Sequence, residues 1–218
     1  MSGEFWRAEA ALSRVLPGRL VTALLAEPRG VAAILRWGLR RRPAGQLFSH
    51  HRDLVVLMCF LVAMTVLEGA VLDFVLRMVL GPSPWVWIVL GLHLWAVYLM
   101  VAAYAGMVTR PHSLDDGVLR LRSGLGTEVG VAVTAIEAAS PGRYPDFDRS
   151  NWRVDGAGNA TMAPNEANLR LMLVPGSEVA LNGRIIPAPR SIHLTADEPR
   201  RLASAIAAAR DDLGATSR

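Results

Sequence analysis

Four ionisable side chains stand in a stretch of the chain that is otherwise rich in apolar residues. Glu68, Asp73, Arg77 and His93 all fall within residues 54–108, among long runs of Leu, Val, Met, Ala and Trp. Ionisable groups are costly inside a bilayer, where they commonly carry or sense protons. The alternative is a structural polar network that holds two helices together or recruits a third. The chemistry of these four residues therefore depends on whether the stretch crosses a membrane.

The length and composition of this stretch predict two membrane-spanning helices, over residues 54–80 and 85–108, joined by the Gly-Pro-Ser-Pro turn at 81–84. About 20 helical residues cross the roughly 30 Å hydrocarbon core, and both runs are longer than that. Backbone polar groups in lipid must be satisfied within the segment, so helices are expected rather than strands. The two prolines cannot continue a helix and therefore favour the turn.

The depth of each ionisable residue suggests its partner. Counted from the turn, Asp73 and His93 lie at about the same depth, which predicts a pair between the two helices. Asp73 and Arg77 are four residues apart and share a helix face, although Arg77 could instead extend to the outer interface. Glu68 lies deeper and has no evident partner in the two helices. A second subunit or a protonated carboxyl group would resolve its charge.

Arginine determines the expected orientation of this hairpin. Positive residues flank its two ends and are absent from the short turn, so both termini are expected in the cytoplasm and the turn outside. The indole rings that follow the turn favour the lipid–water boundary. The residues expected to anchor the chain at the membrane surface are Arg36, Arg40, Arg41, Arg42, Arg52, Trp85 and Trp87.

Residues 1–53 form an arginine-rich lead-in whose apolar residues recur at helical spacing. Pro28 is expected to open the last of its helices, because proline fits the first helical turn. Val31, Leu35 and Leu39 line one side of that helix, with arginines on the other. This pattern favours helices lying in the membrane interface. Helices packed on the soluble domain or on a partner subunit would show the same amphipathic pattern.

Residues 109–218 change to short alternating runs, which predict a separate domain of strands followed by one helix. Asn182-Gly183 is a strong signal for a tight hairpin. Asp197 is expected to cap the terminal helix, and Pro199 fits its first turn. The expected strands cover residues 118–121, 128–133, 136–139, 168–174, 178–181 and 191–195.

This order of elements predicts a small, partly open barrel plugged by the helix, and it resembles the pleckstrin-homology-like (PH-like) fold. The resemblance is to bacterial PH-like domains tethered to membrane helices in actinobacterial proteins. GVLRLRSG at 117–124, NLRLMLVPG at 168–176 and SIHLTADEPRRLASAIAAA at 191–209 carry it. It implies a scaffolding or binding module, not an enzyme. Some PH domains bind phosphoinositides through basic residues in the first loop between strands, but residues 123–127 contain none. Another small barrel or an α+β sandwich is the structural alternative.

The sequence contains no nucleophile elbow, phosphate loop or metal-spaced cluster of His or Cys. Its single cysteine excludes an internal disulfide framework. We therefore expect no catalytic residue, no metal and no cofactor. Tyr144, Phe147 and Trp152 form either an exposed loop that binds a partner or part of the barrel core, and the core is favoured because large aromatic residues are mostly buried.

The net charge of +4 does not indicate nucleic-acid binding, because arginines and acidic residues balance within residues 109–218. The positive excess lies beside the membrane, where each arginine gains about 1 kcal/mol from anionic headgroups. We therefore expect an α+β protein of the bacterial cytoplasmic membrane that contacts lipids and either itself or another membrane protein. Its expected function is that of a non-enzymatic scaffold. The alternatives are an enzyme acting at the membrane surface, or an accessory subunit of a transporter or proton-coupled complex that uses Asp73, His93 and Glu68.

Overall fold

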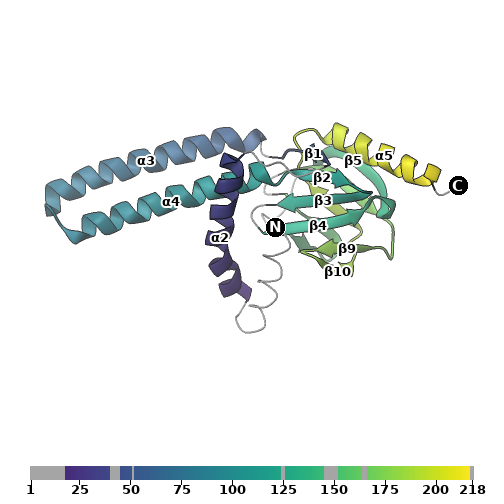
Figure 1. The fold of residues 1–218 in the computed structure, drawn as a ribbon, viewed down its shortest axis with the longest axis horizontal. Coiled ribbons are helices and arrows are strands. Elements are labelled where there is room, and N and C mark those ends of the chain that lie inside the picture. Colours follow the sequence, from purple (N-terminus) through teal and green to yellow (C-terminus); the bar gives the residue numbers. More distant parts are fainter. Residues whose placement is uncertain are drawn as a thin grey trace.

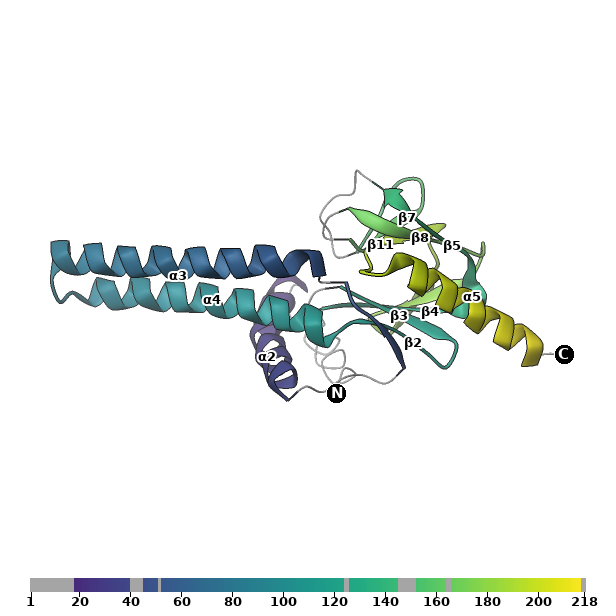
Figure 2. The ribbon, with the colours of Figure 1, turned by 90° about the horizontal axis from the view of Figure 1, so that it is seen from above.

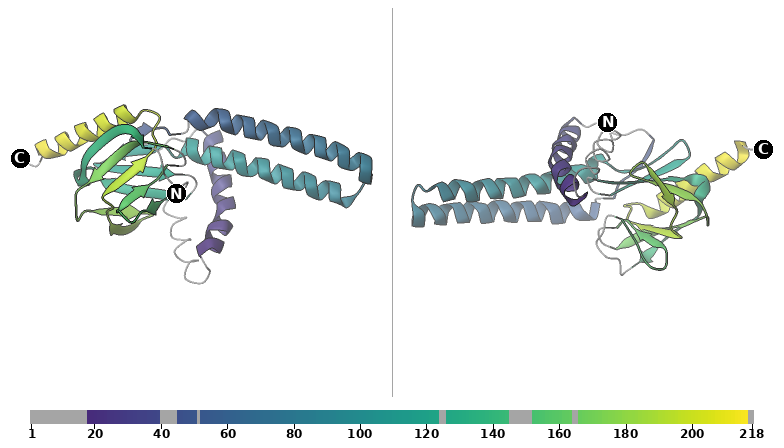
Figure 3. Two further views of the ribbon diagram at one scale, coloured as in Figure 1. Left: turned by 180° about the vertical axis from the view of Figure 1, so that it is seen from behind. Right: turned by 90° about the horizontal axis from the view of Figure 1, so that it is seen from below.

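A long helical hairpin projects from one side of a β-rich domain in the computed structural model (Figure 1). The same separation of hairpin and β-domain is visible from behind and from below (Figure 3). The expected α+β class with two long apolar helices is confirmed. The structure describes residues 18–39, 45–50, 52–123, 126–144, 152–163 and 166–216.

The hairpin consists of α3, Arg52–Leu80, and α4, Pro84–Thr109. Both helices are long and apolar enough to cross a membrane. The most apolar window of α3 is 0% buried and that of α4 is 11% buried, so neither is the core helix of a soluble domain. Between them, Gly81 adopts a positive φ of 61°. Ser83 caps α4 by accepting a hydrogen bond from the Trp85 backbone N–H at 3.4 Å.

A third helix, α2, runs over Gly18–Gly38 and crosses α4 at the base of the hairpin (Figures 1 and 2). The Tyr98 hydroxyl of α4 donates to the Glu27 carbonyl at 3.0 Å. Trp37 and Tyr104 meet edge to face, with ring centroids 5.7 Å apart. A Cβ added to Gly30 would lie 2.9 Å from the Tyr98 hydroxyl oxygen, so this glycine allows the two helices to approach closely.

The helix α2 continues through Pro28, so the prediction that Pro28 opens a new helix was wrong. Proline lacks the N–H that would bond to the carbonyl four residues earlier, and in an isolated helix this loss favours a break. Here α2 is held against α4 close to the proline through Glu27 and Gly30. On the side of α2 away from these contacts, Val31 and Leu35 are exposed.

The first sheet of the β-domain has six strands in the order β1-β2-β3-β4-β9-β10, and every pairing is antiparallel. Two turns have positive φ at both central residues, as the tightest hairpins require. They are Asp116-Gly117 between β2 and β3, and Asn182-Gly183 between β9 and β10, which confirms the predicted hairpin. The strands are β1 Gln46–Phe48, β2 His112–Asp115, β3 Val118–Ser123, β4 Thr127–Ala132, β9 Glu178–Leu181 and β10 Arg184–Pro187.

The second sheet has five strands in the order β5-β8-β11-β7-β6, with β11 parallel to β7 and the other pairs antiparallel. A short 3₁₀ helix, η1 over Val133–Ala135, links β4 to the second sheet. Neither sheet closes into a barrel within the described residues. The strands are β5 Ile136–Tyr144, β6 Arg153–Val154, β7 Asn159–Thr161, β8 Ala167–Leu173 and β11 Ser191–Leu194.

A hydrophobic core fills the space between the two sheets. Alternate residues of β3 and β8, including Leu121 and Leu171, are fully buried in it. The terminal helix α5, Pro199–Thr216, adds Leu202 and Ile206 to this core. The free end of α5 lies on the side of the β-domain away from the hairpin (Figures 1 and 2).

Candidate functional site

Both ends of the hairpin lead into one sheet. The strand β1 precedes α3, β2 follows α4, and the two pair with Phe48 opposite His112. The loop before α5 joins the same junction: the Asp197 backbone N–H donates to the Ser49 carbonyl at 2.8 Å, and its Oδ1 accepts from the Arg52 backbone N–H at 3.1 Å. Asp197, expected to cap the terminal helix, therefore binds the first N–H of α3.

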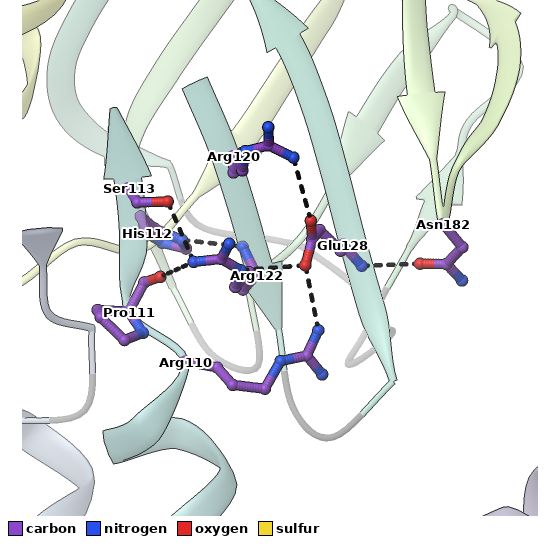
Figure 4. Close-up of polar contacts among 8 residues, drawn as sticks. All are labelled: Arg110, Pro111, His112, Ser113, Arg120, Arg122, Glu128 and Asn182. Atoms are coloured by element: carbon purple, nitrogen blue, oxygen red, sulfur yellow. Dashed lines mark hydrogen bonds and ion pairs between the residues drawn. The ribbon is translucent and has the colours of Figure 1, made fainter. Parts of the chain in front are cut away.

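A cluster of charged residues lies beside this strand pair, and we call it the arginine junction: Arg110, Arg120, Arg122 and Glu128 (Figure 4). The Glu128 carboxylate accepts from Arg122 Nε at 3.1 Å and from Arg110 Nη2 at 3.5 Å, and it lies 3.8 Å from Arg120 Nη1. The Glu128 backbone N–H donates to Asn182 Oδ1 at 2.8 Å. One carboxylate therefore connects the end of α4 to β3 and β4.

Arg122 and His112 fix the chain where it leaves α4. Arg122 Nη1 donates to the Pro111 carbonyl and to Ser113 Oγ, both at 3.1 Å. The Arg122 backbone N–H donates to His112 Nδ1 at 3.0 Å, so the ring proton is on Nε2, which donates to the Thr195 carbonyl at 3.0 Å. Burial lowers the pKa of His112 to about 4; the bond to Thr195 opposes this, and the positive Arg122 adds to it.

A second histidine packs against His112. His50, in the short connection between β1 and α3, stacks on His112 with ring centroids 4.5 Å apart and planes 16° apart. Both rings are buried. A charged imidazole in this stack would lose its hydration and face a second ring at close range, so the packing favours the neutral form of His112.

The helix α2 adds two more arginines to this region. Arg29 Nη1 lies 3.4 Å from the position of a Cβ on Gly126, in the turn between β3 and β4. Burial lowers the pKa of Arg110, Glu128 opposes this, and the like charges of Arg122 and Arg36 add to the lowering. Arg36 Nε is buried and has no hydrogen-bond partner among the described residues. Five guanidinium groups therefore gather where α2, α4 and β3 meet; they belong to Arg29, Arg36, Arg110, Arg120 and Arg122.

The ionisable residues of the hairpin fall into separate groups. Arg77 Nε donates to Asp73 Oδ2 at 2.9 Å, and the guanidinium lies 5.7 Å from the centre of the Trp87 ring. His93 packs instead against Gly69, where a Cβ would lie 3.0 Å from its Cδ2. The structure thus brings Asp73 and Arg77 together, while the contacts of the described residues include no pair between Asp73 and His93.

The separation follows from the packing of the two antiparallel helices. His93 lies opposite Gly69, four residues from Asp73 and so about 6 Å away along the α3 axis. Counting residues from the turn gives approximate depth, but it does not fix the register or the direction of each side chain. Glu68 is exposed on the surface of α3.

The expected surface anchors lie at both ends of the hairpin. Trp85 and Trp87 are 66% and 67% exposed beside the turn, and Arg52 is exposed at the start of α3. Arg36 is partly buried near Arg110. Arg40, Arg41 and Arg42 lie outside the described residues.

Of the aromatic residues considered for partner binding, the structure describes Tyr144 and Trp152, and both are partly buried. Tyr144 stacks on His193 with ring centroids 5.1 Å apart, and Arg170 lies 5.3 Å from the Tyr144 ring centre. Trp152 is partly buried against the hydrophobic core, as the core interpretation expects. Phe147 lies outside the described residues.

Elsewhere on the β-domain, an open depression is lined by Pro141, Arg143, Glu166 and Pro199 among others. Its charged groups bind each other, because Arg143 donates to both Glu166 oxygens at 2.7 and 2.6 Å. Within the described residues, no group of three or more His, Cys, Asp or Glu side chains is placed to hold a metal ion. The arginine junction is therefore the most developed polar arrangement in this part of the chain.

Sequence analysis did not single out the arginine junction, although one signal was available. Arg120 and Arg122 alternate with buried leucines on β3, so both lie on its outer face. Arg122 is directly opposite Glu128 in the β3–β4 register. A prediction of that hairpin register would have found this pair.

Comparisons with protein-family models, with curated proteins and with solved structures found no match for this chain.

Proposed function

We propose that this chain is a membrane-anchored, non-enzymatic scaffold of the bacterial cytoplasmic membrane. The hairpin spans the bilayer twice, both termini are cytoplasmic, and the β-domain is held at the inner face for interaction with partner proteins. The chain works within an oligomer or a larger membrane complex. The bacterial location follows from the resemblance to actinobacterial membrane proteins.

The main structural support for this proposal is the pairing of β1 with β2. A domain joined to a membrane through a flexible linker gains effective concentration for its partners but no fixed orientation. Here the strands at both ends of the hairpin are hydrogen-bonded neighbours, and the Asp197 loop binds the start of α3. These contacts fix the orientation of the β-domain relative to the hairpin as well as its position. A fixed orientation suits a module that presents a surface to other proteins.

The exposed apolar surface of the hairpin supports the membrane placement. Large side chains such as Phe60, Phe74 and Leu94 are 59%, 64% and 63% exposed. Soluble proteins rarely leave contiguous apolar surfaces of this length open to water. The crossing of α2 at the base of the hairpin (Figure 1) is consistent with this placement, because α2 would then lie along the bilayer surface when the hairpin follows the membrane normal.

The PH-like architecture of the β-domain is part of the proposal. Two packed sheets precede a terminal helix, and Leu202 and Ile206 of that helix enter the shared core. The open sheets and the parallel pairing of β11 with β7 differ from the small antiparallel barrel that the sequence suggested.

Native mass spectrometry of the protein, extracted gently from its own membrane, tests the scaffold function. A homogeneous self-assembly or a reproducible protein companion is the expected result. A monomer without any companion protein contradicts the proposal. A companion that is itself an enzyme or transporter would define the process that the scaffold serves.

Cysteine labelling tests the orientation. In a Cys59→Ser background, Pro82→Cys at the turn should react with a membrane-impermeant maleimide added to spheroplasts. Gly214→Cys near the end of α5 should react only after lysis. The reverse pattern would overturn the proposed orientation.

An accessory subunit of a transporter or proton-coupled complex is the second candidate, and the exposed Glu68 on α3 is the observation that favours it. Replacing Glu68 or Asp73 with Gln or Asn should abolish proton-coupled activity of the complex if these groups carry protons. Under the scaffold proposal the same changes weaken assembly and leave the chemistry of the companion unchanged.

A further inference from the structure

The arginine junction falls at the depth of the inner phospholipid headgroups if the hairpin spans the membrane. The 26 residues of α4 extend over about 39 Å at about 1.5 Å per residue. A bilayer with its headgroup regions is roughly 40–45 Å thick. With Trp85 at the outer boundary, Arg110 therefore lies among the inner headgroups, about one bilayer thickness from the turn.

The side chains of α2 at this depth fall on distinct faces of the helix. Gly30 faces α4, whereas Arg29 and Arg36, seven residues apart, share the face that approaches the β-domain. Val31 and Leu35 are exposed on another side of the helix. The arginines of α2 therefore face the β-domain, at the depth of the inner phosphate groups, and the exposed apolar side chains lie on a different side of the helix.

Guanidinium groups in and beside the arginine junction have donors that Glu128 does not use. Among the described residues, Arg36 Nε beside the junction is buried and has no hydrogen-bond partner. The Arg120 side chain is 49% exposed and is the most distant of the three arginines around Glu128. Arg36 also adds its charge to that of Arg110 and Arg122. Arg36 is a residue of α2, and Arg120 lies on the outer face of β3.

We propose that the arginine junction, together with Arg36 of α2, binds the phosphate group of an anionic phospholipid of the inner leaflet, with Arg36 and Arg120 supplying the donors. Guanidinium groups form short, charge-assisted hydrogen bonds with phosphate oxygens, often in pairs. The headgroup depth favours a lipid phosphate over a free one. This inference rests on the proposed membrane placement and specifies the lipid partner.

The test is lipid retention by the full chain in mild detergent, measured by native mass spectrometry. Wild type should retain phosphatidylglycerol in preference to phosphatidylcholine of the same acyl chains. Arg36→Gln and Arg120→Gln should each weaken retention of phosphatidylglycerol roughly fivefold, the usual contribution of one arginine near anionic lipid. Arg184→Gln is the control, because it removes the same single charge from an exposed position outside the junction.

An equal loss in the control, or no loss in either junction variant, overturns the proposal. If inorganic phosphate displaces phosphatidylglycerol and stabilises the lipid-free chain equally well, the site takes free phosphate and the lipid assignment is wrong. Arg120→Gln alone keeps the test valid if Arg36→Gln does not fold, because Arg120 is half exposed.

Alkaline carbonate extraction separates this proposal from the membrane placement. A chain that stays in the membrane pellet but retains both lipids equally contradicts only the phosphate site. A chain released by carbonate contradicts the membrane-spanning hairpin itself.

Discussion

Replacing Glu128 with Gln tests whether the arginine junction holds the β-domain to the hairpin. Glu128, Arg110 and Arg122 have side chains that are only 14%, 13% and 12% exposed. Removing one partner of a buried ion pair leaves the other charge uncompensated and typically costs about 3–5 kcal/mol. Gln keeps the size of the side chain and one acceptor oxygen, so we expect a loss of about 3 kcal/mol. The exposed Arg120 adds little.

Thermal unfolding of the full chain in detergent, followed by intrinsic tryptophan fluorescence, measures this loss. A loss of about 3 kcal/mol corresponds to a fall in Tm of roughly 10 °C for a chain of this size. Glu178→Gln is the matched control, because Glu178 is exposed on β9. The double variant Glu128→Gln/Arg122→Gln should recover part of the loss, since it also removes one uncompensated charge.

A Glu128→Gln protein with the Tm of wild type would refute this reasoning. It would show that solvent or neighbouring groups already compensate the two arginines without the carboxylate. A loss of similar size in Glu178→Gln would mean that the effect reflects the overall charge of the sheet surface and not the contacts within the junction.

Three further predictions concern the junction and the base of the hairpin. The pKa of His112 is lowered from 6.5 to about 4, so between these pH values the unfolded chain binds more protons than the folded chain. The free energy of unfolding should therefore be full above about pH 6.5 and fall by up to about 3 kcal/mol as the pH drops to 4. Unfolding of the His112→Gln variant, measured across the same pH range, should lack this fall. Gly30→Leu should separate α2 from α4, seen as faster trypsin cleavage within α2, whereas Gly38→Leu, with no neighbour within 4 Å, should not. Asp197→Ala removes the acceptor for the Arg52 N–H and should lower the free energy of unfolding by about 1 kcal/mol. Amide hydrogen exchange should become faster only at the start of α3. Unchanged protection of those amides from exchange would contradict the capping role.

Sequence patterns correctly predicted the helices and strands that are determined by residues close together in the chain. The two apolar runs gave both helices of the hairpin, because length and hydropathy alone distinguish such segments. Asn182-Gly183 gave its hairpin, because both residues must adopt positive φ there. The alternating pattern of residues 168–174 gave β8, whose buried and partly buried residues alternate along its length.

The contacts that build the junction are not local, and the sequence did not reveal them. β1 pairs with β2 across the whole hairpin, and Asp197 binds Arg52 from 145 residues away. Glu128 brings together arginines from the end of α4 and from β3. Proline propensity predicted a helix start at Pro28, but tertiary contacts with α4 hold the helix continuous there. Except for Arg122 and Glu128, which face each other in one hairpin, the deciding partner is distant in sequence, so local propensity does not identify it.

A distance measurement by pulsed electron paramagnetic resonance tests most directly whether the β-domain is rigidly mounted on the membrane hairpin. Spin labels at Pro82→Cys in the turn and Arg184→Cys on β10, in a Cys59→Ser background, would report their separation with the chain in lipid nanodiscs. The strand pairing of β1 with β2 predicts one narrow distance distribution. A broad distribution, typical of a domain on a flexible tether, would contradict the account.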